Sequence, residues 1–547
     1  MFNFIQLSSL EKVFPDSEIT GREYLSASVL SDEPFSYQIA YSATDAIEWR
    51  HGVEFSVSVE SPIADCVTLR DVVCVPSEFS FRDTPDDDDF VRRTPGLYPD
   101  LLVPLTGNSI CTVKNTWHSL YVTVRPKDAL PAGEYPITVV FSSPDAAIRK
   151  TFTLEVIGVR LPKTDFIFTN WFHSDCIASV YGVRVFSEKH WSLIGKFMRT
   201  AAENGMNMIL TPLFTPPLDT VIGGERPTVQ LVGVTKNGNG YSFDFTLLDR
   251  WIDLAHASGI EYFEMSHLFT QWGAKAAPKI VATVSGRKKR IFGWDTPSDG
   301  EEYAAFLDAF LPELISHLRK RKIAKKSVFH VSDEPNGAQL ESYLKAKSLI
   351  KKHLRGFRIM DALSDVRLYK SGAVEHPIPA NDAIGPFLGE NIPDLWTYYC
   401  CGQANGCSNA FFGMPLSRTR VIGAQLYKYN IKGFLQWGYN FYYSALSREV
   451  IDPFLTTDAK RAFPSGDAFR VYPGKDGPLE SLRLLTFAEA LNDMRAFRLL
   501  EEHIGHDAVV EMIEKKLGPV AFAMKPSSSD DLLSLREEVN RRIRAYI

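Results

Sequence analysis

The feature that most restricts the fold is a unit repeated from about residue 166 onward: an amphipathic helical segment, a glycine, then an apolar strand. In one copy, residues 190–212, apolar side chains recur at helical spacing, Gly205 stands where a helix C-cap needs positive φ, and a strand leads into Pro212. The same order recurs around Gly259, Gly356 and Gly433. Such units build a parallel sheet.

The number of strands decides between an open sheet and a barrel. We expect eight strands, at residues 166–173, 206–212, 261–267, 327–334, 357–364, 394–400, 433–440 and, more weakly, 468–474. Eight strands fit a (β/α)8 barrel. No glycine-rich phosphate fingerprint follows the first strand, which argues against a dinucleotide-binding fold.

The chain before this region has another pattern. Short alternating runs such as "VEFSVSVES" and "YPITVVFSS" are separated by turn signals, which is typical of a β-sandwich. The last 50 residues or so are helical in pattern. We therefore predict an α/β protein with three parts: an N-terminal β-sandwich (1–160), a (β/α)8 barrel (161–498) and a short C-terminal helical extension (499–547).

Charge and composition exclude several classes of protein. The net charge of −6 comes with no basic block longer than "GRKKR", so a nucleic-acid partner is not expected. No apolar run reaches the length of a membrane span, and no leader pattern begins the chain, so we expect no membrane partner and a cytoplasmic location. The oligomeric state stays open, a homo-oligomer included.

Neither the cysteines nor the acidic run "TPDDDDF" (84–90) predicts a metal. Seven cysteines without a CxxC pair resemble neither a disulfide framework nor a zinc site. Cys400 and Cys401 are adjacent, but neighbouring residues on a strand point to opposite faces. The acidic run lacks the glycine and terminal glutamate of a calcium loop, so we interpret it as a solvated loop. We expect no metal and no cofactor.

Aromatic and polar residues gather at the carboxyl ends of the expected strands, where a barrel builds its active site. We predict that they bind substrate: Trp171, His173, His267, Trp272, His330, Asp361, Tyr398, Tyr399, Trp437, Tyr439 and Asn440. Aromatic rings offer flat apolar faces to a sugar, and amides, imidazoles and carboxylates bind its hydroxyls. A phosphate ester would call for Arg, Lys or glycine-rich amides instead. A carbohydrate is the expected partner, although each aromatic alone could simply pack in the core.

Asp333 and Glu334 stand side by side at the end of the fourth expected strand, before Pro335. Adjacent carboxylates are poorly placed to act as acid and nucleophile on opposite sides of one anomeric carbon. A substrate with a 2-acetamido group removes the difficulty, because its own carbonyl oxygen can attack C1 and form an oxazoline. Glu334 would act as general acid and base, and Asp333 would hold the acetamido N–H. The two must converge where the strand ends or bulges, and we expect Pro335 to hold Glu334 extended.

Several motifs together resemble the catalytic domain of glycoside hydrolase family 123, the β-N-acetylgalactosaminidases. They are "FHVSDEP", "TNWFHSDCIA", "ILTPLFTPPLDT", "SHLFTQWGA", "DLWTYYC", "GFLQWGYNFY" and "FPSGDAFRVYPG". The resemblance runs from about Phe166 to Arg498. It implies a (β/α)8 barrel behind a β-sandwich, retention of configuration, and the roles given above for Asp333 and Glu334. It also implies a tyrosine at the acetamido carbonyl, either Tyr398 or Tyr399.

The expected function is therefore release of a β-linked 2-acetamido sugar, most of all N-acetylgalactosamine, through an oxazoline intermediate. Two alternatives remain open. One is a retaining glycosidase of another specificity with a separate carboxylate nucleophile, such as Glu264 or Asp361. The other is a carbohydrate-binding protein without turnover, although binding alone does not call for two adjacent carboxylates.

Overall fold

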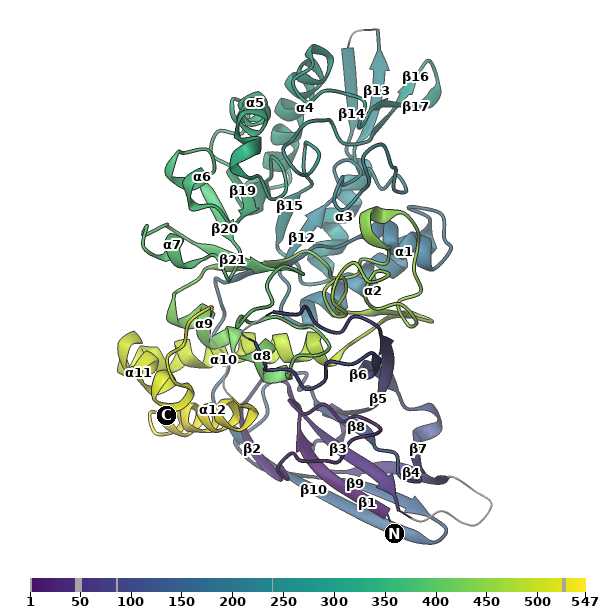
Figure 1. The fold of residues 1–547 in the computed structure, drawn as a ribbon, viewed down its shortest axis with the longest axis vertical. Helices are drawn as coiled ribbons and strands as arrows, with labels where there is room; N and C mark the ends of the chain where they lie inside the picture. The colour runs from purple at the N-terminus through teal and green to yellow at the C-terminus, as the bar shows by residue number, and fades with distance from the viewer. Residues whose placement is uncertain (1, 45–51, 85–86, 239, 524–527) are drawn as a thin grey trace.

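The computed structural model describes residues 2–44, 52–84, 87–238, 240–523 and 528–547. The molecule is elongated, with sheets from the N-terminal third at one end and a barrel at the other (Figure 1). Helices from the last part of the chain lie between the two ends and along one side of the N-terminal sheets.

Two five-stranded sheets form the N-terminal end and share one apolar core. The first has the order β1 (Phe2–Ser8), β3 (Phe35–Ala43), β8 (His118–Val124), β5 (Val67–Ser77), β6 (Gly96–Pro104). The second has the order β2 (Ser26–Leu30), β10 (Ala146–Ile157), β9 (Gly133–Ser143), β4 (Gly52–Glu60), β7 (Ser109–Val113). Alternate residues of both sheets, among them Tyr37 and Phe152 stacked 4.3 Å apart, fill the space between them. The period-two pattern of the sequence is the reason for this layering.

The barrel is one sheet of eight parallel strands that is nearly closed. Its order is β20 (His376–Pro379), β19 (Arg358–Leu363), β18 (Ser327–Phe329), β15 (Tyr262–Met265), β12 (Met208–Thr211), β11 (Ile167–Asn170), β22 (Gly433–Gln436), β21 (Trp396–Tyr399). A bridge between Ala380 and Tyr398 joins the two outer strands of this order. Most strand residues are buried, as expected for parallel strands covered on both faces.

Helices connect the strands in sequence. They are α1 (Ser174–Val180), α2 (Glu188–Glu203), α3 (Thr246–Ala257), α4 (Glu301–Lys320), α5 (Leu340–Lys351), α6 (Val366–Lys370), α7 (Gly385–Leu388), α8 (Leu416–Arg420), α9 (Ile422–Lys428) and α10 (Leu482–Ile504). Helix α2 follows the predicted unit: the Ser187 side chain caps its first turn, and Gly205 follows its end with a φ of 94°.

One of the eight predicted strands was wrong. Residues 468–474 do not join the barrel, because β23 (Tyr472–Gly474) pairs instead with β24 (Gly477–Leu479) in a small antiparallel hairpin. The missing strand is β20, whose sequence "HPIP" holds two prolines and so does not read as a strand. The segments predicted as sixth and seventh strands are therefore the seventh and eighth, β21 and β22.

Insertions after β12 and β15 form a further sheet that the sequence patterns did not indicate. Its order is β14 (Gly240–Asp244), β13 (Gly233–Asn237), β16 (Ile280–Val284), β17 (Arg287–Phe292), and it lies beyond the barrel at the far end from the N-terminal sheets (Figure 1). The chain ends in α11 (His506–Leu517) and α12 (Ser529–Arg544), which pack with α10. The boundary expected at residue 498 falls inside α10.

Buried ion pairs join the N-terminal sheets to the rest of the chain. Arg483 of α10 donates to both oxygens of Asp100 at 2.8 and 2.9 Å, and Arg536 of α12 pairs with Glu33. Arg418 of α8 pairs with Asp87, and neither side chain is exposed. The expectation of a solvated acidic loop is thus wrong for Asp87; residues 85 and 86 of that run lie outside the described residues.

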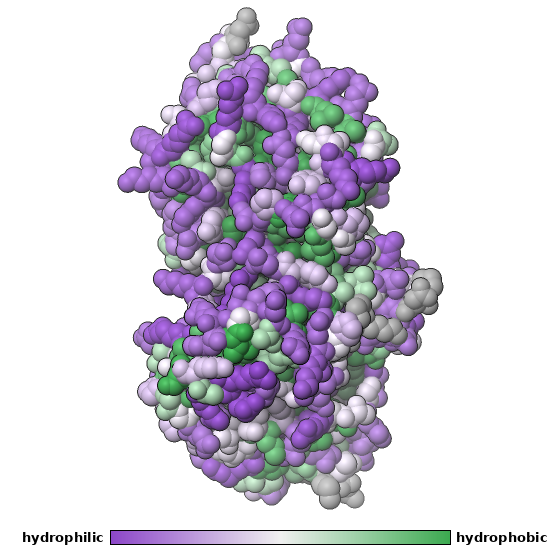
Figure 2. Space-filling view, turned by 90° about the vertical axis from the view of Figure 1, so that its left-hand side faces the viewer, coloured by the Kyte–Doolittle hydropathy of each residue, from purple (hydrophilic) through white to green (hydrophobic). Residues whose placement is uncertain are grey.

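The surface is mostly hydrophilic on the face shown in Figure 2, with apolar residues in small separate groups. Within the described part of the chain, no helix combines the length and apolar character that a membrane span requires.

Candidate active site

A cavity of about 170 Å³ opens at the carboxyl ends of the barrel strands. Every part of its wall comes from a strand end or from the loop that follows one, as is usual for a barrel of parallel strands. Its lining residues are Trp171, His173, Leu218, Asp219, Gln271, Trp272, Asp333, Glu334, Ala362, Tyr398, Cys400, Cys401, Leu435, Trp437 and Phe463. The size suits one sugar ring better than a long ligand.

Asp333 and Glu334 line this one cavity together. Strand β18 ends at Phe329, so the alternation of strand side chains no longer separates the two residues. Glu334 has a φ of 43°, which contradicts the extended conformation we expected before Pro335. A left-handed backbone at a non-glycine residue costs free energy and is often found at functional sites.

The two carboxyl groups are in different electrostatic surroundings. Burial, followed by the charge of Glu334, raises the pKa of Asp333 well above its usual value. Tyr398 donates a hydrogen bond to Oε1 of Glu334 at 2.6 Å. Burial and the charge of Glu334 raise the pKa of Tyr398 well above its usual value, so its hydroxyl stays protonated as a donor.

The structure distinguishes the two adjacent tyrosines that the sequence could not. Tyr398 points into the barrel and lines the cavity. Tyr399 points outward into the layer between strands and helices, packs against Phe434, and accepts a hydrogen bond from Arg470 at 3.2 Å. The alternation of side chains along β21 produces this difference.

A buried chain of charged groups lies in the barrel beside the cavity. Glu264 accepts hydrogen bonds from Thr169, Trp171 and the ring of His330, at 2.6, 2.7 and 2.7 Å. The other ring nitrogen of His330 is 3.4 Å from Asp361, which also accepts from Tyr343 at 2.5 Å. None of Glu264, His330 and Asp361 lines the cavity.

His330, between Glu264 and Asp361 in this buried series of charged groups, carries a positive charge. Burial alone lowers the pKa of His330, but its hydrogen bonds to Asp361 and Glu264 outweigh burial and raise it to about 10. Burial also raises the pKa of Asp361. Glu264, with all its contacts made inside the barrel, orients the Trp171 ring that lines the cavity.

His267, His330 and Asp361 have potential ligand atoms within 4.8 Å of one another, so we asked whether they fit a metal ion. The rings of His267 and His330 are stacked, with centroids 4.5 Å apart and an interplanar angle of 20°. A metal lies in the plane of each imidazole that binds it, and a histidine ligand must be deprotonated. Stacked rings direct their nitrogens along nearly parallel planes and not toward one point, so these residues do not fit, and we assign no metal.

His173 and Trp437 form a second fixed wall of the cavity. Arg226 donates to Nδ1 of His173 at 3.1 Å, and Nε2 of His173 donates to the carbonyl of Trp437 at 2.9 Å. Burial, then the charge of Arg226, lowers the pKa of His173 to about 4, so the ring is neutral. The indole of Trp437 donates to Asp467 at 2.9 Å, which fixes the plane of its ring.

The residues predicted to bind substrate thus separate into two groups. Five line the cavity: Trp171, His173, Trp272, Tyr398 and Trp437. Six do not: His267, His330, Asp361, Tyr399, Tyr439 and Asn440. The Tyr439 hydroxyl donates to the Phe197 carbonyl at 3.0 Å, and the Asn440 amide bonds both backbone groups of His173. We therefore assign Tyr439 and Asn440 a structural role in place of the predicted contact with the sugar.

The sequence patterns missed four polar or reactive residues of the wall: Asp219, Gln271, Cys400 and Cys401. Cys400 and Cys401 follow the end of β21, so both can face the cavity, contrary to our argument from strand alternation. Asp219 lies in the loop after β12, eight positions beyond the strand end. Its one sequence signal is the turn "TPPLDT", which carries a carboxylate in a loop at the carboxyl end of a strand.

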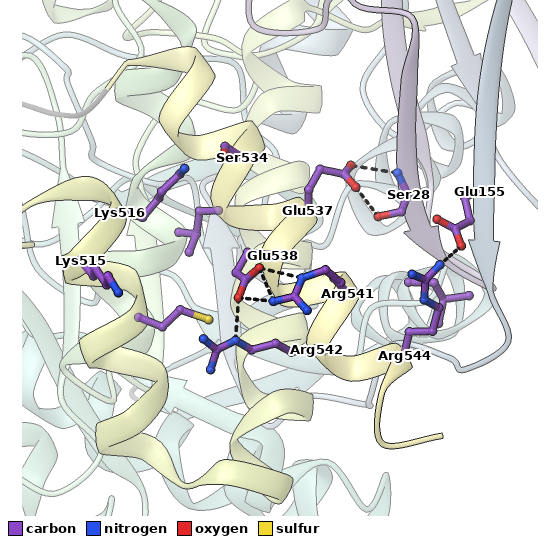
Figure 3. Close-up of a pocket in the computed structure, with 13 residues that line it drawn as sticks. Ser28, Glu155, Lys515, Lys516, Ser534, Glu537, Glu538, Arg541, Arg542 and Arg544 are labelled. Carbon is purple, nitrogen blue, oxygen red and sulfur yellow. Dashed lines mark hydrogen bonds and ion pairs between the residues drawn. The ribbon is translucent and has the colours of Figure 1, made fainter.

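A larger cavity, of about 710 Å³, lies away from the strand ends, between α11, α12 and strands β2 and β10. Figure 3 shows its wall of Lys, Arg and Glu side chains, several of them paired, such as Glu538 with Arg541 and Arg542. It has no aromatic ring in its wall and no barrel strand beside it. The Lys and Arg side chains of this wall lie in the last turns of α11 and α12, where cations usually complement the helix dipole. They therefore do not by themselves indicate a binding site, and the smaller cavity remains the candidate active site.

Comparison with known proteins agrees with this choice. The family model described as "Glycoside hydrolase 123, catalytic domain" matches residues 171–500, which is more than half of the chain. The chain belongs to glycoside hydrolase family 123. Every barrel strand except β11, which ends one residue before it, lies within the matched range, and so do both carboxyl groups of the pair.

Solved structures show the fold of this family 123 protein at low sequence identity. A family 123 glycoside hydrolase from Clostridium perfringens, studied for glycolipid glycan hydrolysis, matches with a TM-score of 0.73 and 16% identity over 100% of this chain and 98% of that chain. A Parabacteroides merdae β-glucuronidase matches with a TM-score of 0.29 and 10% identity over 84% and 50% of the chains, too low to carry an argument. No curated protein sequence matches.

Proposed function

We propose that the protein is a retaining glycosidase that releases a β-linked 2-acetamido sugar, most of all N-acetylgalactosamine, by substrate-assisted catalysis. The observation that supports this best is that Asp333 and Glu334 line one small cavity while the alternative nucleophiles Glu264 and Asp361 do not. Glu264 accepts hydrogen bonds from three neighbours inside the barrel, and Asp361 contacts Tyr343 and His330. A nucleophile supplied by the substrate suits this arrangement.

In the first step Glu334 donates a proton to the leaving oxygen while the acetamido oxygen of the substrate attacks C1. The C1–O bond to the leaving group breaks, the new C1–O bond closes an oxazolinium ring, and Asp333 accepts the hydrogen bond of the acetamido N–H. In the second step Glu334 takes a proton from water, whose oxygen attacks C1 and reopens the ring. Two inversions at C1 give retention of configuration.

The raised pKa of Asp333 has a place in this mechanism. In the empty cavity the pair holds a proton on Asp333, because burial and Glu334 disfavour its charge. A bound acetamido N–H favours the ionised form of the carboxyl that accepts its hydrogen bond. Substrate binding would thus leave Asp333 charged and the proton of the pair available on Glu334, which is the state that the first step needs.

The walls supply the groups that orient a sugar. Trp171 and Trp437 are fixed by Glu264 and Asp467, so their rings offer preorganised apolar faces. Trp272 is 41% exposed at the rim, where it could contact the leaving group. Because the similar Clostridium perfringens structure concerns glycolipid glycans, oligosaccharides of glycolipids are the substrates we propose to test after simple aryl glycosides.

Two ligands test the route. A thiazoline of the matching 2-acetamido sugar mimics the oxazoline, and we expect it to bind far more tightly than the free sugar. A 2-fluoro sugar would instead trap a covalent glycosyl-enzyme if a carboxylate of the protein were the nucleophile. Labelling by the fluoro sugar without inhibition by the thiazoline would favour the separate nucleophile, with Asp219 the first residue to examine. Binding of aryl 2-acetamido-galactosides and glucosides without hydrolysis would favour a carbohydrate-binding protein.

A further inference from the structure

The cavity wall carries charged groups of one sign only, and that sign is negative. Three of its fifteen residues are carboxylic acids, Asp219, Asp333 and Glu334, and none is Lys or Arg. The only histidine of the wall, His173, is neutral, since burial and Arg226 lower its pKa to about 4. A ring that enters this cavity meets acidic groups, one hydroxyl, one amide, two thiols and aromatic faces, and no lysine or arginine.

Asp219 is the carboxylate in this wall that the mechanism does not use. Its backbone has a φ of 39°, its N–H donates to Gln271 at 2.6 Å, and its carbonyl accepts from Ser447 at 2.6 Å. One carboxylate oxygen, Oδ2, accepts from the backbone N–H of Leu446 at 2.9 Å. Two loops thus fix a strained residue in the wall of the cavity, where its charge acts on Asp333, which is a costly arrangement for a residue without a role.

Asp219 acts on the cavity as a charge. Burial raises its pKa to about 6, so it is ionised at neutral pH, and its charge contributes to the raised pKa of Asp333. Arg226 lowers the pKa of Asp219 but does not line the cavity. It is already bonded to both oxygens of Asp175 at 2.7 and 2.8 Å.

We propose that Asp219 is a specificity-determining residue that restricts the cavity to sugar rings without an anionic substituent. This proposal rests on the proposed function and names its substrate class: an uncharged terminal 2-acetamido sugar, with one ring hydroxyl bound by Asp219. A like charge placed in an interface without a counter-charge is rejected strongly.

The proposal also places the reaction in a sequence. A 2-acetamido sugar that carries a sulfate ester must first lose it by hydrolysis, in which water replaces the ester linkage and gives the free hydroxyl and sulfate. A sulfate ester hydrolase therefore has to supply the substrate of this enzyme wherever the glycan is sulfated on its terminal ring.

The test compares three aryl 2-acetamido-galactosides: the unsubstituted sugar, its 6-sulfate and its 6-methanesulfonate. The methanesulfonate has nearly the shape of the sulfate without its charge, so the ratio of the two kcat/KM values isolates the charge effect. We expect the wild-type enzyme to prefer the methanesulfonate by at least about 100-fold. The 4-substituted pair gives a second, independent ratio.

Two variants assign the effect to Asp219. Asp219→Asn should reduce the preference for the uncharged ester at least about tenfold, and Asp219→Ser gives a second estimate should the amide disturb the loop. Asp452→Asn is the matched control, because it removes one negative charge from an exposed residue outside the cavity, and it should leave the ratio unchanged.

Each outcome is decisive. If the unsubstituted sugar is not hydrolysed by the wild type, the proposed function fails. If that sugar is hydrolysed and the sulfate is used as well as the methanesulfonate, the selectivity proposed here is wrong while the function stands. If the wild type shows the preference but both Asp219 variants keep it in full, Asp219 is not its source.

Discussion

Replacing Tyr398 by Phe tests whether the hydroxyl that bonds Glu334 takes part in catalysis. This bond is 2.6 Å long and joins a phenol to a carboxyl group in a cavity wall. A hydrogen bond to a charged group contributes about 1.5–3 kcal/mol, which corresponds to roughly a 10- to 150-fold loss of kcat/KM at about 1.4 kcal/mol per factor of ten. The ring stays in the barrel interior, so the melting temperature should change little.

The leaving group shows through which partner Tyr398 acts. If it orients Glu334, the loss should be larger for an alkyl glycoside than for an activated aryl glycoside, because only the former needs a proton. If it contacts the acetamido carbonyl, as the family resemblance implies, both substrates should lose activity equally. A loss below about threefold on both would refute a catalytic role, given the free energies above.

Tyr399→Phe is the matched control from the adjacent position. Its hydroxyl lies outside the cavity and accepts from Arg470, which is buried. Removing it should lower stability by about 1.5–3 kcal/mol, because the bond is made to a charged group, and leave kcat/KM unchanged. A fall in activity with Tyr399→Phe as large as with Tyr398→Phe would show that both changes act by disturbing β21.

Three further changes have definite expected results. Glu334→Gln should reduce hydrolysis of substrates with poor leaving groups by about 10²- to 10⁴-fold and spare activated aryl glycosides, and equal losses on both would contradict the acid role. The kcat/KM of the wild type should fall as pH rises through the raised pKa of Asp333, because the pair then loses the single proton that substrate binding moves to Glu334; Asp333→Asn should shift that alkaline limb, and an unchanged pH profile would count against the role. Arg483→Met should leave Asp100 buried without its partner and destabilise the protein by about 3–5 kcal/mol, measured by denaturant unfolding; a smaller cost would mean that Asp100 takes up a proton or water.

Local sequence patterns predicted most of the parallel barrel. Helical periodicity before Gly205, Gly259 and Gly356, each with positive φ in the structure, correctly marked where helices end and strands follow. Strand β20 was not predicted, because both prolines of "HPIP" lack an N–H and argue against a strand. Its pairing with β19 depends on neighbours that are distant in sequence, which no local pattern contains.

The candidate site was predictable mainly for residues at a strand end or a few positions beyond it, although Trp272 was predicted seven positions after the end of β15. Asp333, Glu334 and Trp171 lie there, and so does Tyr398 at the end of β21. Asp219 was missed because its position depends on a long loop held by Leu446 and Ser447, more than 200 residues away in sequence. Tyr439 and Asn440 lie outside the cavity because they are buried and make long-range hydrogen bonds, and these too are properties of the folded chain.

Two adjacent carboxyl groups can stand at the mouth of a buried strand because they share a proton, since the charged groups behind the cavity do not neutralise them. His330, with a pKa of about 10, brings one positive charge, but Glu264 and Asp361 already use it through their contacts with the two ring nitrogens. His330 lowers the pKa of Asp333, yet burial and Glu334 outweigh this effect, so the pair carries a proton.

In the proposed mechanism only an N–H donor from the substrate shifts this proton, by favouring a charged Asp333. The 2-acetamido group would then supply the nucleophile and also set the protonation state that makes Glu334 an acid. A plain galactoside would do neither, since its 2-hydroxyl is a weaker nucleophile toward C1 and can accept a hydrogen bond from a protonated Asp333. Selectivity for 2-acetamido sugars would thus follow from the charge balance of the barrel as well as from the shape of the cavity.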